Sequence, residues 1–115
     1  MALANASTGE IIAKEVVESK TFLRRFMGLM LKKDFSGRAM LFSFKKIGRH
    51  SIHTMFMRFP IDLIYLDEKF RVVEIKKNLK PWGFYRPKVQ AKYLIEVPAG
   101  TAKKIRISDA LVLKS

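Results

Sequence analysis

The stretch His53–Asp67, HTMFMRFPIDLIYLD, constrains the fold of this chain more than any other segment. Alternate side chains of a strand face opposite sides, so Asp62 shares one face with Ile64 and Leu66. Both faces after Pro60 are nevertheless largely apolar. A strand that is apolar on both faces lies in the middle of a sheet or in the wall of a barrel. We therefore expect this stretch to be central.

Further apolar runs and turn signals extend this prediction to the whole chain. Apolar alternation predicts strands at residues 10–17, 40–44, 70–77, 92–97 and 110–113. Ser19 is a candidate N-cap for an amphipathic helix over residues 19–27, and Thr101 for one short helical turn. The expected fold class is β-dominated α+β: a small, partly closed, barrel-like sheet of six to seven strands, one main helix and a short C-terminal helical turn.

The length and the residue usage indicate one ordinary globular domain. A chain of 115 residues without cysteine can bury a sufficient core without disulfides, and residues 1–8 are expected to be flexible. No apolar run reaches the roughly 18 residues of a membrane span, and the first ten residues lack the pattern of a signal peptide. We expect a cytoplasmic monomer of residues 1–115 with no cofactor.

The charge balance points to an anionic partner. There are 23 basic residues against 10 acidic ones, which gives a net charge of +13. Such a field attracts nucleic acid or another polyanion, although a basic composition can also serve solubility alone.

The segment Lys76–Lys88, KKNLKPWGFYRPK, concentrates this charge in a long loop. It has five basic residues and no acidic one, with three aromatic residues between them. Such a loop can stack bases and neutralise phosphates, or lie on an anionic membrane. Alternatively, Trp82 and Phe84 fold back as a lid over the barrel. The expected binding residues are Arg58, Lys76, Lys77, Lys80, Trp82, Phe84, Tyr85, Arg86 and Lys88.

A second hypothesis is a small enzyme that uses His53 with Asp62 or Asp67. A straight strand places His53 and Asp62 roughly 30 Å apart, and a tight reversal still leaves roughly 13 Å. The alternative for Asp62 is a structural carboxylate that accepts backbone N–H bonds at the Pro60 turn. His50 and His53 are too few for a metal site, so none is expected.

Four phrases, in order along the chain, resemble a known family. They are RFMGLM at residues 25–30, AMLFSF at 39–44, FMRFPID at 56–62 and EVPAGTA at 96–102. Together they resemble the domain-of-unknown-function family 192 of small prokaryotic proteins. The resemblance implies a small, partly closed β structure with a helix between its first strands, and no established activity. We therefore expect a non-enzymatic binding module for an anionic partner, with a small enzyme and a protein-interaction module as alternatives.

Overall fold

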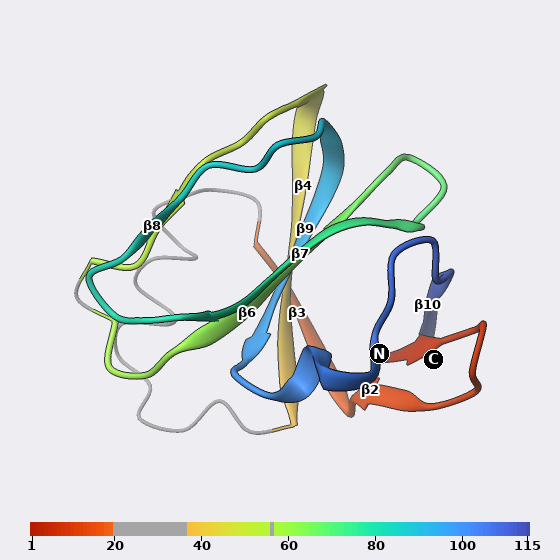
Figure 1. The fold of residues 1–115 in the computed structure, drawn as a ribbon. Coiled ribbons are helices and arrows are strands. Elements are labelled where there is room, and N and C mark those ends of the chain that lie inside the picture. Colours follow the sequence, from red (N-terminus) through yellow and green to blue (C-terminus); the bar gives the residue numbers. More distant parts are fainter. Residues whose placement is uncertain (20–36, 56) are drawn as a thin grey trace.

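Ten strands in three sheets make up the part of the chain that the computed structural model describes, residues 1–19, 37–55 and 57–115 (Figure 1). The largest sheet has five strands in the order β3-β4-β9-β6-β7. Their bounds are β3 Glu15–Ser19, β4 Arg38–Gly48, β9 Ala91–Pro98, β6 Ile61–Leu66 and β7 Val72–Leu79. The β3–β4 pair is parallel, and the other neighbours are antiparallel.

Strand β6 lies between β9 and β7, and all six of its residues are buried. Ile64 and Leu66 belong to one core cluster, and Leu63 and Tyr65 belong to the other. The five-stranded sheet therefore separates two cores, one on each face. The prediction of a central strand with two apolar faces is confirmed for this half of the stretch.

A three-stranded sheet covers one face of the large sheet. Its order is β10-β1-β2, with β10 at Leu111–Lys114, β1 at Ala2–Asn5 and β2 at Ile11–Ala13. Its apolar side chains share a core with those of β6 and β9 and with the 3-10 turn η1, Thr101–Lys104. Figure 1 shows both chain ends beside this sheet. Residues 1–8, expected to be a flexible end, thus contain a paired strand with Leu3 fully buried.

A two-stranded sheet lies toward the opposite core. It pairs β5, Ile52–His53, with β8, Phe84–Tyr85, and Ile52 and Tyr85 both pack on the second core cluster. Of the two alternatives, a straight strand through residues 53–62 is wrong, because β5 ends at His53 and β6 begins only at Ile61. The long loop expected over Lys76–Lys88 is corrected as well, because β7 continues to Leu79 and Phe84–Tyr85 form β8.

The observed class is nearly all-β, and the barrel-like single sheet is corrected to three separate sheets, with no closed barrel in the described residues. The short helical turn after Gly100 is confirmed as η1. The helix expected over residues 19–27 falls almost entirely outside the described residues. The first predicted strand is divided at Lys14 into β2 and β3, which join different sheets, and this division accounts for part of the higher strand number.

Candidate functional site

The turn at residues 80–83, between β7 and β8, is fastened by one buried threonine. The Thr54 hydroxyl donates to the carbonyl oxygen of Lys80 at 2.6 Å and accepts the N–H of Gly83 at 2.8 Å. The backbone of Thr54 also accepts from the N–H of Trp82 and donates to the carbonyl of Gly83, each at 2.9 Å. These four bonds fix the turn from inside the molecule.

Gly83 is required by this arrangement. A Cβ at position 83 would lie 2.8 Å from the carbonyl oxygen of Lys80 and 3.0 Å from a methyl group of Leu79. A clash with a backbone oxygen at that distance cannot be relieved by a side-chain rotation, so any larger residue would displace the turn.

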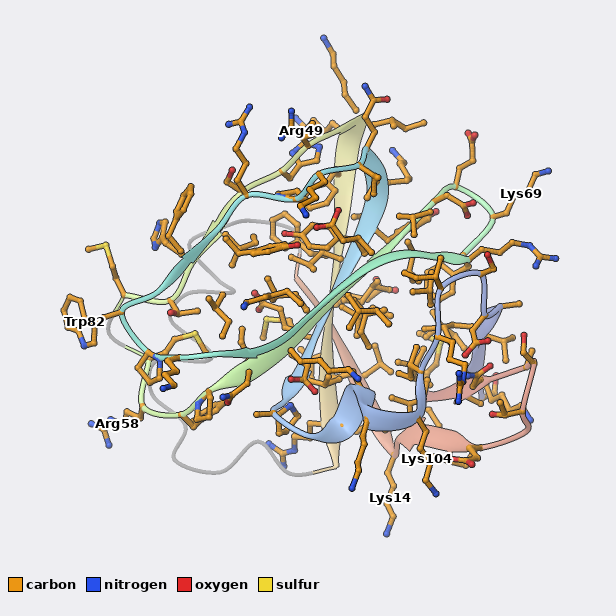
Figure 2. All side chains as sticks on the ribbon, in the orientation of Figure 1. Lys14, Arg49, Arg58, Lys69, Trp82 and Lys104 are labelled. Carbon is orange, nitrogen blue, oxygen red and sulfur yellow. The ribbon has the colours of Figure 1, made fainter. Side chains whose placement is uncertain are left out.

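The fastened turn presents aromatic side chains to solvent. Trp82 is 63% exposed and Phe84 is 64% exposed, and the neighbouring Met55 is also exposed. Trp82 has a φ of +62°, a left-handed conformation that costs a non-glycine residue roughly 1–2 kcal/mol. Figure 2 shows Trp82 and Arg58 projecting from the same side of the molecule. We call Met55, Arg58, Lys80, Trp82 and Phe84 the tip. At these exposures, Trp82 and Phe84 do not form a lid over the core.

Glu74 holds the segment that follows the tip. Its carboxylate accepts a short hydrogen bond from the Tyr85 hydroxyl, and the N–H groups of Lys88 and Val89 at 2.8 and 3.0 Å. Burial, together with the hydrogen bond to Glu74 and its negative charge, raises the pKa of the Tyr85 hydroxyl to about 12. At physiological pH the Tyr85 hydroxyl is therefore neutral and joins the loop to Glu74 of β7. The centroid of the Tyr85 ring lies 6.3 Å from that of the Tyr65 ring.

The basic residues expected to bind divide into three groups. Lys80, Arg86 and Lys88 are exposed along the loop, as is Arg58. Lys76 is half-buried, with its amino group 5.8 Å from the centre of the Tyr85 ring. Lys77 instead lines a cavity beside Asp62 and η1. Lys80 thus lies in the turn that presents Trp82, whereas Tyr85 and Lys88 are both bonded to Glu74 and Lys76 lies over the Tyr85 ring.

Asp62 has the structural contacts that the sequence suggested. It is 1% exposed, and its two carboxylate oxygens accept the N–H groups of Asn78, Gly100 and Ala102 at 2.8, 2.9 and 3.0 Å. The expectation of a carboxylate that accepts backbone N–H bonds is confirmed. The segments that it ties are the end of β7 and the start of η1, rather than the Pro60 turn.

The remaining candidates for acid–base chemistry lie apart from Asp62. His53 is in β5 opposite Phe84, a different sheet from the β6 strand of Asp62. Asp67 accepts the N–H groups of Lys69 and Arg71 at 2.9 and 3.0 Å and so closes the β6–β7 turn. His50 stacks on Phe44, and one of its ring nitrogens lies 2.9 Å from the Lys46 carbonyl oxygen. Within residues 1–19, 37–55 and 57–115, no three acidic or histidine side chains come together as metal ligands.

Sequence reasoning missed Thr54 and Glu74, the two residues that shape the loop. Glu74 carried a usable signal: it is the acidic residue just before an acid-free basic segment, and strand alternation places it on the face of Lys76. Thr54 carried no such signal, because its bonds depend on the pairing of β5 with β8.

In the described part of the chain, no helix has the length and apolarity needed to span a membrane.

Comparisons with known proteins give a consistent result. Residues 3–113 match the model of the DUF192 family, described as "Uncharacterized ACR". A UPF0127 protein of Pyrococcus horikoshii is 40% identical over 92 residues, 80% of this chain and 79% of that protein. A UPF0127 protein of Pyrococcus furiosus is 36% identical over 111 residues, 95% of each chain.

Two solved structures share the fold. A Sinorhizobium meliloti protein described as a "putative transcription regulator" superposes with a TM-score of 0.80 at 22% identity, over 96% of this chain and 89% of that one. A protein of unknown function from Novosphingobium aromaticivorans superposes with a TM-score of 0.79 at 17% identity, over 97% and 82% of the two chains. At these identities the likeness concerns the fold alone.

Proposed function

Because this chain belongs to the uncharacterised DUF192 (UPF0127) family, its surface is the guide to its function, and we propose that it is a binding module for single-stranded nucleic acid. The observation that carries the proposal is the exposure of Trp82 and Phe84 on a fastened turn among unburied cations. Bases stack on exposed aromatic rings, and lysine and arginine neutralise the phosphates between them.

The energetics of the turn support a role for Trp82 outside the core. Exposing a large aromatic ring gives up the stabilisation that burial would provide, and the left-handed backbone adds a further cost. Four hydrogen bonds from Thr54 nevertheless hold the residue in this position. A ligand that stacks on the ring would recover the apolar burial, and a rigid turn would bind it without an ordering penalty.

Charge supports the choice of an anionic ligand. Within the described residues, the one ion pair joins Arg38 to Glu15 at 3.6 Å, so the cations of the tip have no carboxylate partner there. Nucleic acid is favoured over an anionic membrane because the protruding rings stand among cations and can stack on bases. The description of the Sinorhizobium meliloti protein falls in the same broad class of function.

The test separates stacking from charge. Single-stranded oligonucleotide should quench or shift the fluorescence of Trp82, the only tryptophan, at low salt. In anisotropy titrations of a labelled oligonucleotide, Trp82→Gly should weaken binding by about 1–3 kcal/mol while keeping the salt slope. Glycine suits the left-handed φ at this position, so the variant should remain folded.

Lys80→Ala with Arg86→Ala should instead flatten the slope, by roughly 0.7 log units per log unit of salt for each phosphate that the variant no longer neutralises. The matched control is Lys69→Ala with Lys114→Ala, which removes the same charge from the β6–β7 turn and from β10. A response of Trp82 to anionic vesicles but not to oligonucleotide would replace nucleic acid with a membrane surface. No response to either would contradict the proposal.

A further inference from the structure

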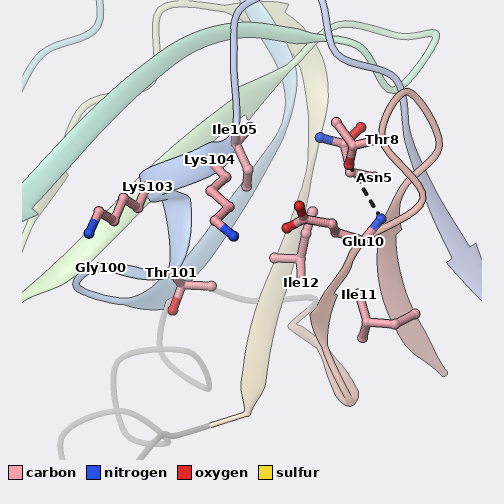
Figure 3. A pocket seen from close by; sticks show the side chains of 10 residues that line it. All are labelled: Asn5, Thr8, Glu10, Ile11, Ile12, Gly100, Thr101, Lys103, Lys104 and Ile105. Atoms are coloured by element: carbon pink, nitrogen blue, oxygen red, sulfur yellow. Dashed lines mark hydrogen bonds between the residues drawn. The ribbon is translucent and has the colours of Figure 1, made fainter.

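A cavity of about 370 Å³ lies at the end of β7, where β7 meets η1. Its lining includes Lys77, Asn78, Gly100, Lys103 and Asp62. Gly100 and Lys103 also line a neighbouring cavity of about 230 Å³, to which Lys104 contributes (Figure 3). Lys77 and Lys103 therefore line one hollow, and Lys103 and Lys104 line the next.

The charge of this hollow favours an anion. Both oxygens of Asp62 are already bonded to backbone N–H groups, and the residue is buried. Lys77 and Lys103 are exposed, and among the described residues neither is within ion-pair distance of a carboxylate. Two lysine charges against one fully bonded carboxylate leave an excess of one positive charge. In the neighbouring cavity, Lys103 and Lys104 stand against Glu10, so the excess there is also one positive charge. Only in the cavity of Lys77 and Lys103 is the single carboxylate already engaged by three backbone N–H groups.

We propose that Lys77 and Lys103 bind a phosphate group of the same strand that stacks on the tip. This inference rests on the proposed function and extends its interface along β7. Lys77 is five residues before Trp82, so the Cα atoms of these two residues are at most roughly 18 Å apart. A stacked strand rises about 3.4 Å per nucleotide, so roughly five nucleotides span this Cα separation, and the reach of the two side chains adds to it.

Oligonucleotide length provides the first test. Binding of oligodeoxyadenylates of roughly three and roughly eight nucleotides is measured by anisotropy, with Lys77→Ala/Lys103→Ala beside the equally charged control Lys69→Ala/Lys114→Ala. Figure 2 places Lys69 at the far side of the molecule from Trp82. The Lys77/Lys103 variant should bind the longer strand roughly tenfold more weakly, with a smaller salt slope, and bind the shorter strand as before. The control variant should change both strands equally and slightly.

Inorganic tripolyphosphate provides a second test that does not need the tip. Amide resonances of Lys77, Asn78, Gly100 and Lys103 should shift on titration, and the shifts should disappear in the Lys77→Ala/Lys103→Ala variant. These shifts with an unchanged affinity in Trp82→Gly would overturn the stacking role of the tip and keep the phosphate site.

Two results would overturn the phosphate site itself. One is equal weakening by both double variants, which would show a general effect of charge. The other is a Lys77/Lys103 variant that melts at a lower temperature but binds both strands and tripolyphosphate normally. The two lysines would then serve only to balance the charge of Asp62.

Discussion

At the scale of single residues, four of the ten acidic side chains of this basic protein accept hydrogen bonds from its own backbone. Asp62 ties β7 to η1, Asp67 closes the β6–β7 turn, and Glu74 holds the segment after the tip. Asp109 accepts the N–H of Arg106 and a hydrogen bond from Asn5, and these two bonds hold the pKa of its carboxyl group below the ordinary value. Carboxylates engaged in this way keep their negative charge but have fewer lone pairs left for direct ion pairs with surface lysines.

Asp62→Ala should lower the free energy of unfolding by at least about 3 kcal/mol, because it leaves three backbone N–H groups without their acceptor and one carboxylate cavity unfilled. Urea denaturation followed by circular dichroism measures the loss. The control is Asp67→Ala, which removes a half-buried turn carboxylate and should cost only about 1 kcal/mol. Equal losses in the two variants would show that burial of Asp62 adds nothing.

At the scale of elements, the sequence predicted strands where a periodic pattern was decisive. The six residues of β6, the strands β7 and β9 and the turn at Asp67 could be predicted because alternation and turn chemistry are local. The break in the strand at residues 54–60 could not be predicted, because buried Thr54 forms its hydrogen bonds with a turn some thirty residues away. The exposed aromatic pair follows from the same long-range pairing, which no local pattern encodes.

Thr54→Val tests the hydrogen bonds that hold the turn at residues 80–83, without changing any side chain of the tip. Valine has nearly the shape of threonine but loses the hydroxyl group that joins Lys80 to Gly83, so it should lower stability by about 1–3 kcal/mol. It should also weaken oligonucleotide binding, although no aromatic or basic residue changes, because the tip loses its fixed geometry. Thr54→Ser keeps the hydroxyl and should retain most of both properties. Normal affinity in Thr54→Val would show that the tip binds without being held.

At the scale of the whole molecule, the fold carries a large uncompensated charge. A net charge of +13 repels itself within dimensions of 34 × 28 × 24 Å. Any polyanion that binds the folded chain should therefore stabilise it twice, by mass action and by relief of this repulsion.

The melting temperature should rise as sodium chloride is increased from low to physiological concentration, because salt screens the repulsion over a Debye length of about 8 Å. Differential scanning calorimetry measures the shift, and equal osmolality of glycerol serves as the control for non-ionic effects. One equivalent of oligonucleotide at low salt should raise the melting temperature more than sodium chloride added at the same concentration as the phosphates of that oligonucleotide. A melting temperature that falls or stays constant with salt would show that the charges are spaced too widely to repel.

The pairing of β1 with β10 also determines when the three-stranded sheet can form during translation. Asn5 bonds to Asp109, 104 positions later, and β1 is the middle strand of its sheet. At roughly 5–20 residues per second, a ribosome needs about 5–20 s to make the segment between them. During that interval β1 has no β10 to pair with, and Leu3 lacks part of its core. The nascent chain therefore keeps an open, apolar strand edge until β10 leaves the exit tunnel.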